Sequence, residues 1–342
     1  MMQEIKKVGI IGGGKMGTSL FNYMSSFNIK IVWYRRSHAE KAEEKNKRKL
    51  ERQLKNNIIT QESFKYRIEN QLITADIHTL ATADLIIECI KEDKDEKIDL
   101  FRKLSFIVKK TTIFASNSSS ISPSEIGSSC SVKNSVIGLH FFYPVELKNI
   151  VELIVSNNTD TDVIKTVEQF LIKINKFYLL QDQSNAFILN KIMLKVQATA
   201  CFLAKEKNLT YAQLDFMVRK ELFPMGVFET MDQIGIDVLY HSVMNYMPTI
   251  DNPHYYKILC DHLQSLYNQQ KLGIKTGCGF YNYNTDSSSE NKDIEIDTDI
   301  SEYIIHQLKA AYNNAIETTI TENKCNQKDL HFALEEYNGT GI

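Results

Sequence analysis

The chain begins with a glycine-rich motif that directly follows a short apolar segment. Residues 8–11 read Val-Gly-Ile-Ile, which is typical of a strand buried on both faces of a sheet. The motif GxGxxG follows at Gly12, Gly14 and Gly17. In such a motif the first glycine permits a tight strand-to-helix turn, the second lets the backbone approach a pyrophosphate, and the third lets the helix pack closely on the strand. Because a second apolar segment follows at residues 29–34, the motif predicts dinucleotide binding.

Strand and helix signals alternate after this motif up to about residue 182. Strand-like segments lie at residues 83–88, 112–116, 136–139, 151–155 and 177–180, and helical segments at 93–109 and 161–174. This alternation predicts an α/β fold with a doubly wound parallel sheet of the Rossmann type. The pattern that follows is helical, so an all-α C-terminal domain is expected. We therefore expect a nucleotide-binding domain at residues 1–182, with a helical excursion at 38–70, and a helical domain at 183–284.

The last part of the chain resembles the helical domain itself. Residues 285–299 are polar and acidic, which predicts a linker. In residues 300–342, a shift of 116 residues aligns apolar positions with those of the helical domain. Residues 187–189 fall on 303–305, Leu214, Phe216 and Val218 fall on Leu330, Phe332 and Leu334, and Met225-Gly226 falls on Thr340-Gly341 with one residue deleted. We interpret this segment as a truncated repeat of the helical domain, the alternative being a chance match between amphipathic helices.

Composition excludes several classes of protein. The 342 residues carry 40 basic and 42 acidic side chains, a net charge of −2 that gives no overall field for nucleic acid. No apolar run approaches the roughly 18 residues of a membrane span, and no signal-peptide core precedes the first strand. The six cysteines lack CxxC or paired spacing, so reduced thiols are expected and a metal site is not. A cytoplasmic protein is the resulting expectation.

The residue after the second strand bears on the choice of cofactor. An enzyme that uses NAD commonly has an acidic residue at this point, to bind the ribose 2′-hydroxyl. This chain has Arg35, followed by Arg36. A guanidinium suits the 2′-phosphate of NADP and cannot accept a hydrogen bond from a hydroxyl. Alternatively, Arg35 stacks on adenine or faces solvent while NAD is used, so NAD and NADP both stay open.

Four polar residues downstream of the motif describe a site for oxidising an alcohol. These residues are Ser119, His140, Glu152 and Asn190. Histidine, whose ordinary pKa is about 6.5, can take or give a proton near neutral pH, and a carboxylate can orient it. Ser119 follows a predicted strand, where doubly wound sheets bind ligands. Each also has a structural alternative: His140 as a buried core histidine, Ser119 as part of a helix cap, and Asn190 as a packed polar residue.

The chain resembles the L-3-hydroxyacyl-CoA dehydrogenase family, which includes the 3-hydroxybutyryl-CoA dehydrogenases. The stretches that carry this resemblance are residues 116–120, 138–144, 223–229 and 271–281. The likeness runs from the glycine-rich motif to about Tyr283, and the four polar residues keep the family's spacing. It implies reversible hydride transfer between C3 of a 3-hydroxyacyl thioester and NAD(P), a place in fatty acid metabolism, and a homodimer formed by the helical domain.

The resemblance also assigns roles to individual residues. It implies that His140 is the general base or acid, that Glu152 orients it, and that Ser119 and Asn190 bind the reacting oxygen or the thioester carbonyl. It places Glu92 and Lys97 at the nicotinamide ribose. The family commonly has asparagine where this chain has Tyr143, near the nicotinamide, and glycine where it has Ala186.

Some alternatives stay open within this resemblance. The charged excursion is interpreted as a solvated helix face, or else as a basic arm for the phosphates of a coenzyme A tail. Nucleic acid is not expected there, because acidic residues are interleaved and no aromatic platform accompanies them. The substrate is an acyl-CoA or, alternatively, an acyl group on a carrier protein. From a different class, the alternative is a dinucleotide-binding relative that has no catalytic activity.

Overall fold

The computed structural model describes residues 4–132, 135–284, 296–322 and 325–338. Residues 285–295 of the predicted linker and the predicted match at Thr340-Gly341 therefore lie outside the described residues. The chain forms two compact units, Met1–Ala186 and Phe187–Ile342. Within the described ranges, no helix combines the length and the apolar character needed to cross a membrane.

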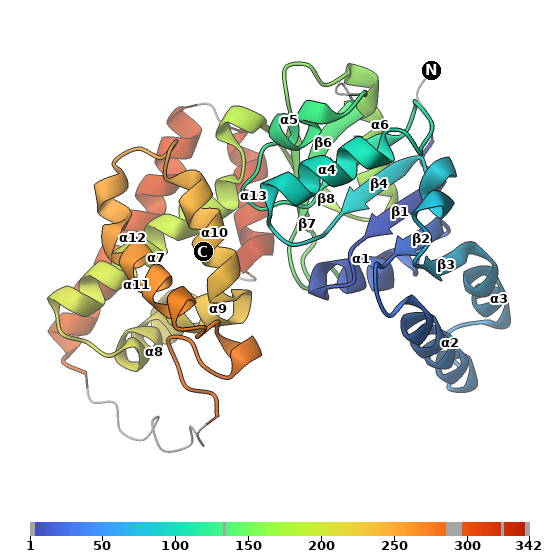
Figure 1. The fold of residues 1–342 in the computed structure, drawn as a ribbon. Helices are drawn as coiled ribbons and strands as arrows, with labels where there is room; N and C mark the ends of the chain where they lie inside the picture. Colours follow the sequence, from blue (N-terminus) through green and yellow to red (C-terminus); the bar gives the residue numbers. More distant parts are fainter. Residues whose placement is uncertain (1–3, 133–134, 285–295, 323–324, 339–342) are drawn as a thin grey trace. The chain divides into compact units, whose positions relative to one another are not determined.

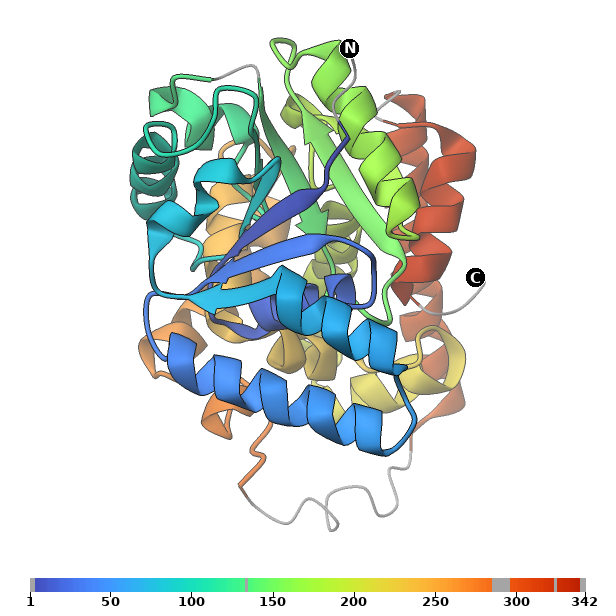
Figure 2. The same cartoon turned by 90° about the vertical axis from the view of Figure 1, so that its right-hand side faces the viewer.

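The first unit is built on an eight-stranded sheet with the order β3-β2-β1-β4-β5-β6-β7-β8 (Figures 1 and 2). Its strands are β1 (Lys7–Ile11), β2 (Lys30–Tyr34), β3 (Gln71–Thr74), β4 (Leu85–Glu88), β5 (Ile113–Ser116), β6 (Val136–Phe141), β7 (Ile150–Val155) and β8 (Phe177–Asp182). All neighbours run parallel except β6 and β7. The predicted doubly wound sheet is confirmed, with this one reversal. The reversal follows from the short connection at residues 142–149, since a parallel crossover needs about a dozen residues or more.

Helices cover both faces of this sheet and place its core. They are α1 (Lys15–Met24), α2 (Ala39–Lys55), α3 (Gln61–Asn70), α4 (Lys94–Leu104), α5 (Pro123–Ile126) and α6 (Thr161–Lys173). One apolar core joins α1 and α6 to one face of the sheet, and a second joins α4 and α5 to the other face (Figure 1). Neighbouring residues of a strand such as Ile10 and Ile11 enter opposite cores and are both buried. Both faces of the strand are thus covered, as its continuous apolar run predicts.

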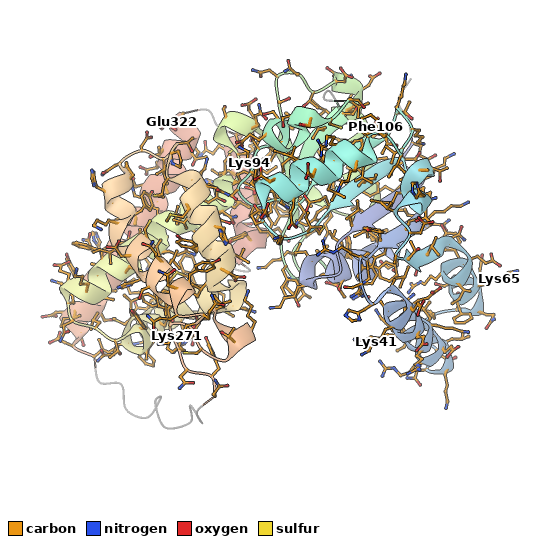
Figure 3. All side chains as sticks on the ribbon, in the orientation of Figure 1. Lys41, Lys65, Lys94, Phe106, Lys271 and Glu322 are labelled. Carbon is orange, nitrogen blue, oxygen red and sulfur yellow. The ribbon has the colours of Figure 1, made fainter. Side chains whose placement is uncertain are left out.

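The charged excursion forms α2 and α3 beside the edge strand β3 (Figure 2). The side chains of Lys41 on α2 and Lys65 on α3 are exposed and point into solvent in Figure 3. Lys65 lies 4.0 Å from Glu69, an ion pair at the i,i+4 spacing of a helix surface. These features fit a solvated helix face, the first of the two interpretations given above.

The second unit is helical, as predicted. Its helices are α7 (Ile188–Glu206), α8 (Tyr211–Glu221), α9 (Val227–Ile234), α10 (Ile236–Tyr246), α11 (Lys257–Asn268), α12 (Thr298–Thr321) and α13 (Gln327–Asn338). The buried Asp215 of α8 caps α9 from outside that helix, because it accepts hydrogen bonds from the backbone of Phe228 (3.1 Å) and Glu229 (3.0 Å). It also accepts one from Tyr281 Oη at 2.8 Å. These contacts give residues 223–229 and 271–281 a structural role.

Candidate active site

The glycine-rich loop between β1 and α1 leaves room for a ligand. Gly12 has φ +126°, and a Cβ there would lie 2.5 Å from the carbonyl oxygen of Cys89. A Cβ on Gly17 would lie 2.1 Å from the carbonyl oxygen of Gly12, so the fold itself requires both glycines. At Gly14, the N-cap residue of α1, a Cβ would meet nothing within 4 Å. The open space therefore lies at a helix N-terminus, where backbone N–H groups favour a phosphate.

Arg35 follows β2 and lies against this loop. Its guanidinium carbon is 4.6 Å from the centroid of the Trp33 ring, a cation–π contact, and Nη2 donates to the carbonyl oxygen of Gly13 at 3.3 Å. Among the described residues, the buried Nε of Arg35 has no hydrogen-bond partner. An unsatisfied buried donor costs free energy, which a further hydrogen-bond acceptor at this atom would recover.

His140 and Glu152 meet because β6 and β7 are antiparallel. The two residues lie directly opposite each other in the register of this strand pair. His140 Nδ1 lies 2.6 Å from Glu152 Oε2, and both side chains are buried. The second carboxylate oxygen, Oε1, accepts a hydrogen bond from Gln181 Nε2 on β8 at 2.8 Å. Gln181 was not identified from the sequence, although a polar residue in a largely apolar strand is a signal for such a role.

Ser119 lies on the other side of the His140 ring. Its Oγ is 3.1 Å from His140 Nε2, so the ring is held between a serine and a carboxylate. Glu92 fixes the serine loop that follows β5, since its Oε1 accepts hydrogen bonds from Ser119 N (3.0 Å), Ser120 Oγ (2.8 Å) and Ser118 Oγ. The structure therefore brings Ser119, His140, Glu152 and Glu92 together.

A buried lysine connects Glu92 to the end of β4. Lys97 Nζ lies 2.7 Å from Glu88 Oε1 and 3.4 Å from Glu92 Oε2, and the Lys97 side chain is 1% exposed. Glu88 Oε2 also accepts from Ser116 Oγ at 2.7 Å. The role of Glu88 was not identified from the sequence. The signal for it is a carboxylate at the end of the otherwise apolar strand β4.

The electrostatics of this group favour the charged forms. Burial acts to raise the pKa of Glu92, but Lys97 and the hydrogen bonds from the serine loop outweigh it and lower that pKa. Burial likewise acts to lower the pKa of Lys97, whereas Glu88 and Glu92 outweigh it and raise that pKa. The pair Lys97 and Glu92 is therefore ionised near neutral pH.

Tyr143 and Asn190 are described by their own surroundings. Tyr143 follows β6 and is 51% exposed, and its peptide bond to Pro144 is cis. Asn190 belongs to the second unit, where its Nδ2 lies 3.5 Å from Oη of the buried Tyr246. Tyr246 was not identified from the sequence, because it lies 56 residues from Asn190.

Comparison with known proteins gives matches over both units. Residues 7–182 match the model of the 3-hydroxyacyl-CoA dehydrogenase NAD binding domain, and residues 187–283 match that of the 3-hydroxyacyl-CoA dehydrogenase C-terminal domain. Both matches end before α12 begins at Thr298.

Individual relatives agree with these matches. A 3-hydroxybutyryl-CoA dehydrogenase of Bradyrhizobium diazoefficiens is 28% identical over 286 residues, which cover 83% of this chain and 97% of that protein. One of Clostridioides difficile is 29% identical, over 81% of this chain and 99% of that protein.

Solved structures show the same fold. The 3-hydroxybutyryl-CoA dehydrogenase of Escherichia coli superposes with a TM-score of 0.80 at 20% identity, covering 99% of this chain and 89% of that chain. The (S)-3-hydroxybutyryl-CoA dehydrogenase of Ralstonia eutropha superposes with a TM-score of 0.73 at 25% identity, covering 82% and 99%. With the family models matching most of its length, the chain belongs to the 3-hydroxyacyl-CoA dehydrogenase family.

Proposed function

We propose that the chain is a dehydrogenase that transfers hydride reversibly between C3 of a 3-hydroxyacyl-CoA and a nicotinamide dinucleotide. The observation that carries this proposal is the hydrogen-bonded series of Ser119, His140 and Glu152 in a member of this family. The names of the relatives from B. diazoefficiens and C. difficile support a short acyl chain, as in 3-hydroxybutyryl-CoA.

In the proposed reaction His140 carries the proton. A bound nicotinamide cofactor supplies the acceptor for the hydride that leaves C3. As the C3–H and O–H bonds break and the C=O bond forms, Nε2 of His140 takes the hydroxyl proton. Nδ1–H donates to Glu152, which fixes the tautomer and stabilises the imidazolium. In the reverse direction the same nitrogen returns the proton to the ketone oxygen.

Ser119 and Asn190 are proposed to bind oxygen atoms of the substrate. Ser119 Oγ lies within hydrogen-bond distance of His140 Nε2. A substrate hydroxyl that binds to this nitrogen is therefore also close enough to hydrogen-bond Ser119 Oγ. Asn190, from the second unit, is proposed to bind the thioester carbonyl through its amide. Both groups would strengthen their hydrogen bonds as negative charge develops on oxygen.

We expect Ser119→Ala to lower kcat by about 100-fold, because one donor to the developing charge is lost. Ser119→Thr keeps the hydroxyl and is expected to restore most of the activity. Steady-state rates with acetoacetyl-CoA measure both effects, with the exposed Ser128→Ala as a matched control. An unchanged kcat for Ser119→Ala would assign this serine to the structure of the loop alone.

Glu92 is proposed to serve both the cofactor and Ser119. The family resemblance places Glu92 and Lys97 at the nicotinamide ribose. Since Lys97 is 1% exposed and the Glu92 side chain 14%, we propose that Glu92 makes the contact with the ribose and that Lys97 supports Glu92. Through the backbone N–H of Ser119, the same carboxylate positions the serine beside His140.

We further propose that the cofactor is NADP(H), with Arg35 binding the 2′-phosphate. The support is the buried Nε of Arg35, which has no hydrogen-bond partner in the described part of the chain, and the position of the guanidinium against the glycine-rich loop. The guanidinium of an arginine pairs with phosphate through strong, oriented hydrogen bonds. The stacking of Arg35 on Trp33 holds the guanidinium in place for that contact.

We expect the kcat/KM of the wild-type protein to be about 10- to 100-fold higher with NADPH than with NADH. This ratio corresponds to the free energy of a hydrogen bond to a charged group, about 1.5–3 kcal/mol. Arg35→Asp should reverse the preference, because a carboxylate repels the 2′-phosphate and accepts from a 2′-hydroxyl. The neighbouring exposed Arg36→Asp serves as the control for a change of surface charge. A wild-type preference for NADH would contradict this proposal and leave the dehydrogenase reaction intact.

A further inference from the structure

The last two helices, α12 and α13, repeat the α7–α8 hairpin in local structure. The shift of 116 residues takes the bounds of α8 to residues 327–337, and α13 spans Gln327–Asn338. The same shift takes the bounds of α7 to residues 304–322, and α12 ends at Thr321 after starting earlier, at Thr298. The second helices of the two hairpins therefore start at equivalent positions, and the first helices end within one residue of equivalent positions.

The helix caps are equivalent as well. Thr210 caps α8 by accepting from the backbone N–H of Gln213 at 3.2 Å. Asn326, at the equivalent position, accepts from the backbone N–H of Asp329 at 3.3 Å. Asparagine and threonine are both favoured N-cap residues, so the sequences differ while the cap is kept.

The two hairpins also bury equivalent faces. In the first hairpin the buried residues include Ile188, Leu189, Ile192, Leu214, Met217 and Val218; in the second, Ile304, Ile305, Leu308, Leu330, Ala333 and Leu334. Each residue of the second set lies 116 positions after its counterpart in the first. The counterpart of Asn190 is His306, which is exposed, so the second hairpin keeps the packing positions and loses the proposed substrate amide.

The contacts between the hairpins are reciprocal. The helix α12 packs along its counterpart α7, while α12 also contacts α8 and α13 contacts α7 (Figure 1). Because α12 corresponds to α7 and α13 to α8, the contact of α12 with α8 is matched by the contact of α13 with α7. Such matched contacts are the pattern of a two-fold interface between identical subunits. The ring of Tyr312 on α12 packs edge-on against Phe223, which follows α8, with centroids 5.6 Å apart.

We propose that α12 and α13 occupy the face of α7 and α8 that would otherwise receive a second copy of the chain, so that this protein is a monomer. Without α12, the residues of α7 that it covers would form an exposed apolar face, which requires a partner. Here that partner is the α12–α13 hairpin of the same chain. Its buried residues lie at positions equivalent to those of the α7–α8 hairpin that it covers. This proposal takes the place of the homodimer implied by the family resemblance, and it is independent of the proposed reaction.

The test is sedimentation velocity on the full-length protein over a wide range of concentration. We expect wild-type protein to sediment as a single chain of 39.4 kDa at every concentration. Leu308→Asp places a charge in the buried face of α12, releases α12 from α7, and is expected to produce dimers through the uncovered face. Ala310→Asp, which puts the same charge on the exposed face of α12, should remain monomeric.

A dimer of the wild-type protein would overturn the proposal. So would Leu308→Asp protein that stays monomeric while amide hydrogen exchange shows α12 released from α7. Far-ultraviolet circular dichroism establishes whether this variant retains its helices. If it does not, the mass of the wild-type protein decides the question alone.

Discussion

Replacing His140 by alanine is expected to lower kcat for the reduction of acetoacetyl-CoA by about 100- to 10,000-fold, the usual contribution of a general acid–base group. The imidazole is buried between Ser119 and Glu152, and no other imidazole among the described residues has these two partners. Because the proposed cofactor contacts lie at Arg35, Glu92 and the glycine-rich loop, the dissociation constant of the reduced cofactor should hardly change. Steady-state kinetics and a cofactor titration measure the two quantities separately.

The control for His140→Ala is the exposed His78→Ala, which is expected to have wild-type activity. Glu152→Gln keeps the size of the partner and removes its charge, so the imidazolium loses its stabilisation. We expect it also to lower kcat while cofactor binding is kept. If His140→Ala protein binds the cofactor and turns over within a few-fold of wild type, His140 is a core histidine and the proposed mechanism is wrong.

Replacing Lys97 by methionine is expected to lower the free energy of unfolding of the first unit by about 3–5 kcal/mol. Methionine fills much of the same volume, but it removes the cation that lies 2.7 Å from the buried Glu88 carboxylate and 3.4 Å from the partly exposed Glu92 carboxylate. The only tryptophan of the chain, Trp33, lies buried on β2. Its fluorescence during denaturation by urea therefore reports the unfolding of this unit.

Lys94→Met is the matched control on the same helix. Lys94 pairs with Glu125 at 2.6 Å, but the two side chains are 52% and 47% exposed, and Figure 3 shows Lys94 at the surface of α4. An exposed pair of this kind contributes at most about 1 kcal/mol. Equal losses of stability for Lys97→Met and Lys94→Met would contradict the view that the buried Lys97 neutralises the carboxylates of Glu88 and Glu92.

The fold was largely predictable because buried parallel strands appear as apolar runs. Strand β3 was missed, since it has four residues, only one of them buried, and follows directly after the charged α3. The antiparallel direction of β7 was also missed, because an apolar run carries no direction. Only the length of the connection at residues 142–149 held that information.

The residues proposed for catalysis were found more easily than those that support them. His140 and Glu152 stand out as polar residues in apolar segments, and the family spacing joins them. Glu88 and Gln181 each carry a local signal, a polar residue in an apolar strand, but that signal does not name the partner: Glu88 accepts from Lys97 and Ser116, and Gln181 donates to Glu152. The stacking of Arg35 on Trp33 was accessible from the sequence, because residues two apart on a strand lie on the same face.

The most direct test of the proposed reaction is the oxidation of NADPH and of NADH, at equal concentrations, by purified full-length protein with acetoacetyl-CoA. We expect oxidation that depends on the thioester and is faster with NADPH. A protein that binds either cofactor, as reported by the fluorescence of Trp33 beneath Arg35, and oxidises neither in the presence of acetoacetyl-CoA would contradict the proposal that it is a 3-hydroxyacyl-CoA dehydrogenase.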